Sequence, residues 1–75
     1  MKFTAKDPST GLIHSLEAKP EKYNGEQGYR ILYENGSNFF IANKYGTWRL
    51  MDDHFADVGF LANIGLAIEH RYSET

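Results

Sequence analysis

The residues best suited to chemistry in this sequence lie close together, at Asp52, Asp53, His54 and Asp57. An imidazole among three carboxylates could hold a divalent metal ion or act as a general acid and base. The same carboxylates have a simpler use, because an aspartate before a helix caps its first N–H groups and complements its dipole. We favour capping by Asp53 or Asp57, and we keep a small-ligand or metal site around His54 as the alternative.

Elsewhere the sequence gives weaker indications of chemistry. His14 lies between Ile13 and Ser15 in an expected strand, where a lone histidine is more often a partly buried side chain than a general base. No glycine-rich loop follows a strand and opens a helix, so no phosphate-binding site is predicted. We therefore expect a protein that is not an enzyme, with no catalytic residue, no metal and no cofactor.

Composition excludes several further classes of protein. The chain has 75 residues and no cysteine, which rules out disulfides, thiolate zinc sites and thiol catalysis. Its formal net charge is −2, so no general attraction to nucleic acid or anionic lipid is expected. The sequence has neither a signal-peptide core nor an apolar run long enough to cross a bilayer. We expect a cytoplasmic protein of one domain, residues 1–75.

Turn residues and alternating patterns predict an antiparallel meander of four to five strands. The expected strands lie at 2–6, 12–19, 29–34, from 38 onward, and after a turn at 43–47. The pairs Asn24-Gly25 and Asn35-Gly36 favour two-residue hairpin turns, whereas the turn at 43–47 favours a three-residue loop with a bulge. Pro20 lacks an N–H, so the second strand either ends there or runs along a sheet edge.

The last expected element is an amphipathic helix that begins near residues 52–57 and ends near residue 71. Leu61, Ile64 and Ile68 recur at the spacing of one helical face, with Val58 and Gly65 beside them. A glycine costs about 1 kcal/mol relative to alanine in a helix, so we expect Gly65 to allow close contact with a bulky sheet residue. Leu66 lies about 180° from this face. The predicted fold class is α+β, a β-meander followed by one C-terminal α-helix packed on one sheet face.

The expected registers divide the apolar side chains between the two faces of the sheet. The face under the helix receives most of them: Leu16, Ala18, Tyr29, Ile31, Tyr33, Phe40, Ala42, Trp48 and Leu50. The opposite face receives a smaller apolar patch bordered by arginines: Leu32, Phe39, Ile41, Met51, Arg30 and Arg49. A three-residue loop after the third strand would shift the fourth strand by one residue and exchange Phe39 with Phe40.

An exposed apolar patch bordered by charges is typical of a contact surface between proteins. We therefore expect a protein–protein interaction module that self-associates as a homodimer through the face opposite the helix, or that binds an unidentified protein there. Single-stranded nucleic acid is a further alternative, because aromatic rings beside arginines can stack on bases. The acidic residues Glu17 and Glu34 offset these arginines, which argues against nucleic acid.

Overall fold

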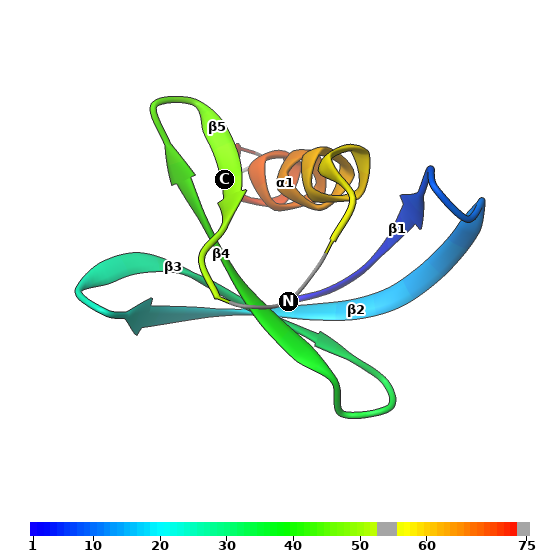
Figure 1. The fold of residues 1–75 in the computed structure, drawn as a ribbon, viewed down its shortest axis with the longest axis horizontal. Coiled ribbons are helices and arrows are strands. Elements are labelled where there is room, and N and C mark those ends of the chain that lie inside the picture. Colours follow the sequence, from blue (N-terminus) through cyan, green and yellow to red (C-terminus); the bar gives the residue numbers. More distant parts are fainter. Residues whose placement is uncertain (53–55, 74–75) are drawn as a thin grey trace.

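The computed structural model describes residues 1–52 and 56–73. The elements are β1 (Lys2–Asp7), β2 (Leu12–Tyr23), β3 (Glu26–Tyr33), β4 (Asn38–Lys44), β5 (Thr47–Leu50) and the helix α1 (Val58–Ser73). The strands form one antiparallel sheet, in which each strand lies beside its neighbours in the sequence (Figure 1). The predicted α+β fold, a β-meander with one C-terminal helix packed on one sheet face, is confirmed.

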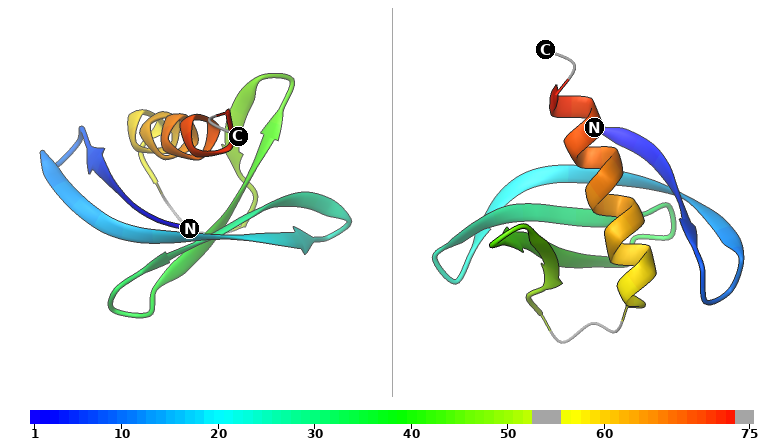
Figure 2. Two further views of the ribbon diagram at one scale, coloured as in Figure 1. Left: turned by 180° about the vertical axis from the view of Figure 1, so that it is seen from behind. Right: turned by 90° about the horizontal axis from the view of Figure 1, so that it is seen from above.

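The sheet is strongly curled, and α1 lies on its concave side, between the edge strands β1 and β5 (Figure 1, Figure 2). We call the face beneath the helix the inner face and the opposite one the outer face. The core forms where α1 meets the inner face, from these buried side chains: Ala5, Leu16, Ala18, Ile31, Phe39, Ile41, Phe60, Leu61, Ile64 and Ile68.

The β2–β3 hairpin has the predicted register. Both residues of the turn Asn24-Gly25 have positive φ, 49° and 80°, as a type I′ turn requires. Ala18 pairs with Ile31, which is the register that a two-residue turn at Asn24-Gly25 gives. β2 continues past Pro20 to Tyr23, beyond the last residue that pairs with β1. Pro20 therefore lies in an edge segment, which is one of the two outcomes expected for it.

The next two hairpins each differ by one residue from the register first expected. A three-residue loop, 34–36, joins β3 to β4; Gly36 has a φ of 93°, and the N–H of Tyr33 donates to the Ser37 carbonyl. Two residues, Tyr45 and Gly46, join β4 to β5, and both have positive φ, 55° and 83°. The loop at 34–36 is the three-residue alternative predicted from the sequence for this turn. The prediction of a three-residue loop before β5 is wrong, because that turn has two residues.

The two differences change which side chains face the helix. The first places Phe39 and Ile41 on the inner face, so their assignment to the outer patch is wrong. Phe40 takes the outer face instead, because adjacent residues of a strand point to opposite sides. The second difference compensates for the first, so Trp48 and Leu50 lie on the inner face as expected.

Asp57 caps the helix and determines where it begins. Its carboxylate accepts hydrogen bonds from the N–H groups of Gly59, at 2.9 Å, and Phe60, at 3.3 Å. Capping by Asp57 is confirmed. Asp53 and His54 lie outside the described residues, and so does the alternative site expected around them.

Candidate interaction site

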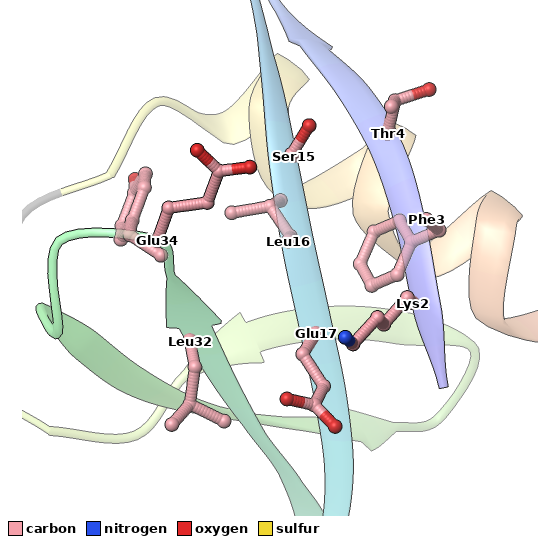
Figure 3. Close-up of a pocket in the computed structure, with 9 residues that line it drawn as sticks. Lys2, Phe3, Thr4, Ser15, Leu16, Glu17, Leu32 and Glu34 are labelled. Carbon is pink, nitrogen blue, oxygen red and sulfur yellow. The ribbon is translucent and has the colours of Figure 1, made fainter.

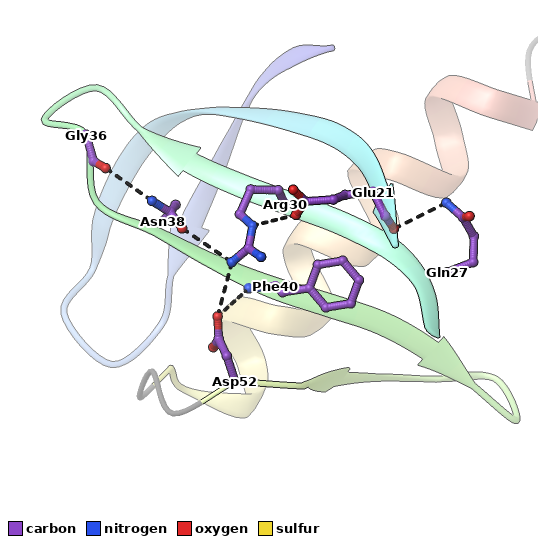
Figure 4. Close-up of polar contacts among 7 residues, drawn as sticks. All are labelled: Glu21, Gln27, Arg30, Gly36, Asn38, Phe40 and Asp52. Carbon is purple, nitrogen blue, oxygen red and sulfur yellow. Dashed lines mark hydrogen bonds and ion pairs between the residues drawn. The ribbon is translucent and has the colours of Figure 1, made fainter. Parts of the chain in front are cut away.

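Phe40 lies on the outer face and is nevertheless 0% exposed. Its ring packs against Tyr23, with 5.3 Å between centroids. The guanidinium of Arg30 lies 5.4 Å from the centroid of the Phe40 ring (Figure 4). It also lies 5.6 Å from the centroid of the Tyr23 ring, so it covers both rings. Gly28 leaves room for the ring, because a Cβ there would lie 2.7 Å from Phe40 Cζ. The β2–β3 hairpin therefore covers Phe40, the second of the adjacent residues Phe39 and Phe40.

Polar contacts hold Arg30 over the ring (Figure 4). Its Nε donates to the Glu21 carboxylate at 2.7 Å. Its Nη1 lies 3.4 Å from an oxygen of Asp52 and 3.3 Å from the side-chain oxygen of Asn38. The same Asp52 oxygen accepts the backbone N–H of Phe40 at 3.0 Å. Arg30 and Asp52 were both candidates for function from the sequence. In the structure Arg30 covers the Phe40 ring, and Asp52 holds Arg30 and the Phe40 N–H.

The other outer residues of the expected patch do not form a continuous apolar surface. Leu32 and Met51 are half-buried and Arg49 is exposed. Phe40 pairs with Arg30 on one side, and its carbonyl accepts the N–H of Met51 on the other. The covered Phe40 therefore stands between Leu32 and Met51.

A wide open hollow of about 760 Å³ lies where β1, β2 and β3 curl past one another (Figure 3). Leu32 and Phe3 contribute apolar surface to it, and most other lining groups are charged or hydroxylic: Lys2, Thr4, Ser15, Glu17, Tyr33 and Glu34. Burial raises the pKa of the Tyr33 hydroxyl, and the carboxylate of Asp7 adds to the rise. No histidine is among the residues that line the hollow.

Metal-binding groups are not gathered in the part of the chain that the structure describes. Residues 1–52 and 56–73 contain no cluster of three histidine, aspartate or glutamate side chains that could hold an ion. His14 packs its ring against Tyr33, at 5.4 Å, and Phe60, at 5.5 Å, and so contributes to the aromatic cluster of the inner face. Metal binding near His54 and nucleic-acid binding stay predictions from the sequence.

A narrower open groove of about 310 Å³ runs between α1 and the β4–β5 hairpin. Val58 is 80% exposed beside it and Leu66 is 62% exposed. Val58, Ala62 and Leu66 recur every four residues and so form a stripe along one side of α1. We call Trp48, Val58, Ala62 and Leu66 the groove surface. The exposure of Leu66 agrees with its position opposite the core stripe, whereas Val58 was expected beside that stripe.

Trp48 forms the wall of the groove on the sheet side. Its indole lies against Gly65 of α1, where a Cβ would overlap the ring, so the predicted close contact at Gly65 is confirmed. Its Nε1 donates to the carboxylate of Glu69 at 3.3 Å. The indole is half-buried and lines the groove.

The edge of the sheet at β1 is partly closed by the helix. Met1 and Ala18 exchange backbone hydrogen bonds, and this sets the alternation along β1. Lys2, Thr4 and Lys6 consequently direct their backbone groups away from β2. The side-chain N–H of Asn63 on α1 donates to the Lys6 carbonyl at 2.8 Å.

The edge at β5 is open in the described structure. The N–H of Met51 donates to the Phe40 carbonyl at 2.9 Å, which sets the alternation along β5. Trp48 and Leu50 consequently direct their backbone N–H and C=O groups away from β4. Among the described residues, none forms a hydrogen bond with these outward groups.

Comparison of the chain with protein-family models, with curated proteins and with solved structures finds no match. Within residues 1–52 and 56–73, no helix is both long enough and apolar enough to cross a membrane.

Proposed function

We propose that the protein is a non-enzymatic interaction module that binds another protein chain through the groove surface. The observation that supports this role is the exposure of Val58 and Leu66 next to Trp48, beside an open groove. Apolar side chains gathered in one place and bordered by polar ones are typical of protein contact sites. The outer face supports the role less well, because Arg30 covers its largest apolar ring.

A second copy of the chain is the simplest partner, since two-fold dimers are the commonest closed assemblies. Light scattering over a concentration series tests self-association. If the wild type is a dimer, Leu66→Asp should yield monomers when the groove surface forms the contact, and Leu32→Asp should do so when the outer face does. Ile13→Asp is the matched control, because Ile13 is 70% exposed and lines neither hollow. A wild type that stays monomeric at high concentration would exclude self-association.

Binding of a different protein is tested by selection from a displayed library of random peptides. Peptides that recognise the groove surface should bind the wild type and Ile13→Asp equally, and should lose binding to Leu66→Asp. Trp48 is the single tryptophan of the chain, so their binding should also change its fluorescence. Failure to select any peptide that depends on Leu66, together with a monomeric wild type, would reject the interaction role.

A further inference from the structure

We infer that the partner bound at the groove surface is an extended peptide strand that pairs with β5 and alternates apolar and acidic side chains. The inference rests on the proposed function and adds the chemistry of the partner. Three features of β5 support it: a backbone edge that no described residue covers, an apolar groove on one side of that edge, and on the other side an arginine with no ion-pair partner among the described residues.

The backbone edge supplies the first part of the recognition. Trp48 and Leu50 each present one outward donor and one outward acceptor, which is the pattern that an added antiparallel strand requires. The β1 edge is protected by comparison, because Lys2 and Lys6 flank it and Asn63 already holds one of its carbonyl groups. β5 contains neither lysine nor proline.

The inner and outer sides of β5 favour different side chains in the partner strand. Residues of the added strand that oppose Trp48 and Leu50 would point to the inner side, where Trp48 lines the groove and Leu50 packs against the core. Glu69 at that groove already accepts the indole N–H, and it would repel an acid placed there. Apolar residues therefore fit these two positions.

The residue between them would lie on the outer side, opposite Arg49. Arg49 is exposed and has neither an ion pair nor a hydrogen bond from its side chain to any described residue. A carboxylate directly across a strand pair attracts such a guanidinium group. The partner is thus expected to carry the sequence apolar, acidic, apolar at three consecutive positions.

The same geometry argues against pairing of β5 with the β5 of a second copy. In the centred antiparallel register, Trp48 of each copy would oppose Leu50 of the other, and Arg49 would oppose Arg49. Like charges directly across a strand pair are destabilising. A different chain with an acid at this position replaces the repulsion with attraction.

The test uses a blocked pentapeptide of threonine, valine, glutamate, valine and threonine as the probe, titrated into ¹⁵N-labelled wild type. We expect the amide signals of Trp48 and Leu50 to shift and their exchange with water to slow by about tenfold or more at saturation. A control peptide with lysine in place of glutamate should bind about tenfold more weakly. A control with both valine amides N-methylated should not bind, because methylation removes the donors to the β5 edge.

The charge preference is tested by a reversal. Arg49→Glu should bind the lysine peptide better than the glutamate peptide, an exchange that a merely damaged protein would not show. Absence of binding by the glutamate peptide, equal binding of the N-methylated peptide, or an unchanged preference in Arg49→Glu would overturn the inference. If displayed peptides that depend on Leu66 are found in the same study, the proposed function survives that failure. If none is found and the wild type is also monomeric, both the inference and the proposed function are rejected.

Discussion

Phe39 and Phe40 are adjacent in the sequence and both 0% exposed, yet they are covered by different means. Phe39 lies against Tyr33 and Phe60, with centroid distances of 5.9 Å and 6.5 Å, so its cover comes from β3 and from a distant helix. Phe40 is covered by side chains of a single hairpin, which include a charged one. A buried aromatic on the far face of a sheet therefore requires neither a second helix nor a second chain.

Arginine is suited to this task for a physical reason. Its planar cation is attracted to the face of an aromatic ring, and its edges stay available for hydrogen bonds. Arg30 uses these edges for Glu21 and Asp52, which lie on either side of it. The outer face thus combines a buried ring with a charged surface.

Replacing each phenylalanine by alanine should show the largest difference between the cover of Phe39 and the cover of Phe40. Phe39→Ala should lower the free energy of unfolding by about 4–5 kcal/mol, because the rigid core leaves a cavity. Phe40→Ala should cost less, about 2–3 kcal/mol, because the long side chain of Arg30 can settle into the space. Urea denaturation of both variants measures the difference. Equal losses would show that the two covers are equally rigid.

Two glycines, one beside Phe40 and one beside Trp48, test the packing of the outer and the inner face. A Cβ at Gly28 would overlap the Ile41 carbonyl and the Phe40 ring, so Gly28→Ala should cost about 1–3 kcal/mol. Gly65→Ala should cost about 1 kcal/mol less, because Trp48 can shift toward the groove and alanine favours the helix. Denaturation midpoints give the energies, and the fluorescence of Trp48 should change in Gly65→Ala. An unchanged spectrum would contradict the contact at Gly65.

The charged cover itself should contribute a smaller amount. Arg30→Ala is expected to lose about 1–2 kcal/mol, since each cation–π contact contributes about 0.5–1 kcal/mol and partly exposed ion pairs add little. Arg30→Met keeps an apolar stem over the ring and should recover about half of that loss. Denaturation of the two variants separates the packing from the charge. A methionine variant as unstable as the alanine variant would assign the whole effect to charge.

The smallest expected effect concerns Tyr33, which covers one end of Phe39. Burial, with a contribution from Asp7, raises the pKa of its hydroxyl above the usual value of about 10. The folded protein thus favours the neutral hydroxyl more than the unfolded chain does. This stabilisation is complete below the unfolded pKa and is lost as the pH rises through the folded pKa. Above about pH 10, the denaturation midpoint of the wild type should fall more steeply than that of Tyr33→Phe; parallel curves would contradict the shift.

Turn chemistry explains how much of the sheet could be predicted from the sequence. Asn24-Gly25 forms the two-residue turn that this pair favours, and the register of β2 and β3 follows from it. Asn35-Gly36 is the same pair, yet the side chain of Asn35 accepts the N–H of Ser37 at 2.9 Å and a three-residue loop results. Both loops are compatible with the dipeptide, so the face of Phe39 could be predicted only as one of two alternatives.

The turn before β5 could not be predicted for a different reason. Tyr45 has a φ of 55°, a conformation that is uncommon for a bulky residue. The side chain of Asn43 accepts the N–H of Gly46 at 3.0 Å and supports the turn. The register of β3 with β4 and the register of β4 with β5 each differ by one residue from the register first expected. The two differences cancel at β5, so the predicted face of Trp48 is correct.

The groove surface was only partly visible in the sequence. Leu66 stood out because it lies opposite the core stripe of the helix. Val58 did not, because its phase is close to that stripe, and its exposure depends on how α1 sits between β1 and β5. β5 is an edge because it is the last strand of the sheet, and the register determines which of its residues direct their backbone groups outward.

The order of the strands has a kinetic consequence. Each strand pairs with its neighbour in the sequence, so every hairpin closes over a short loop and loses little chain entropy in forming. The bond from Asn63 to the Lys6 carbonyl, by contrast, joins residues 57 positions apart. Docking of α1 onto β1 is therefore expected to be the last step of folding. Loss of that bond in Asn63→Ala would speed unfolding and leave the folding rate nearly unchanged.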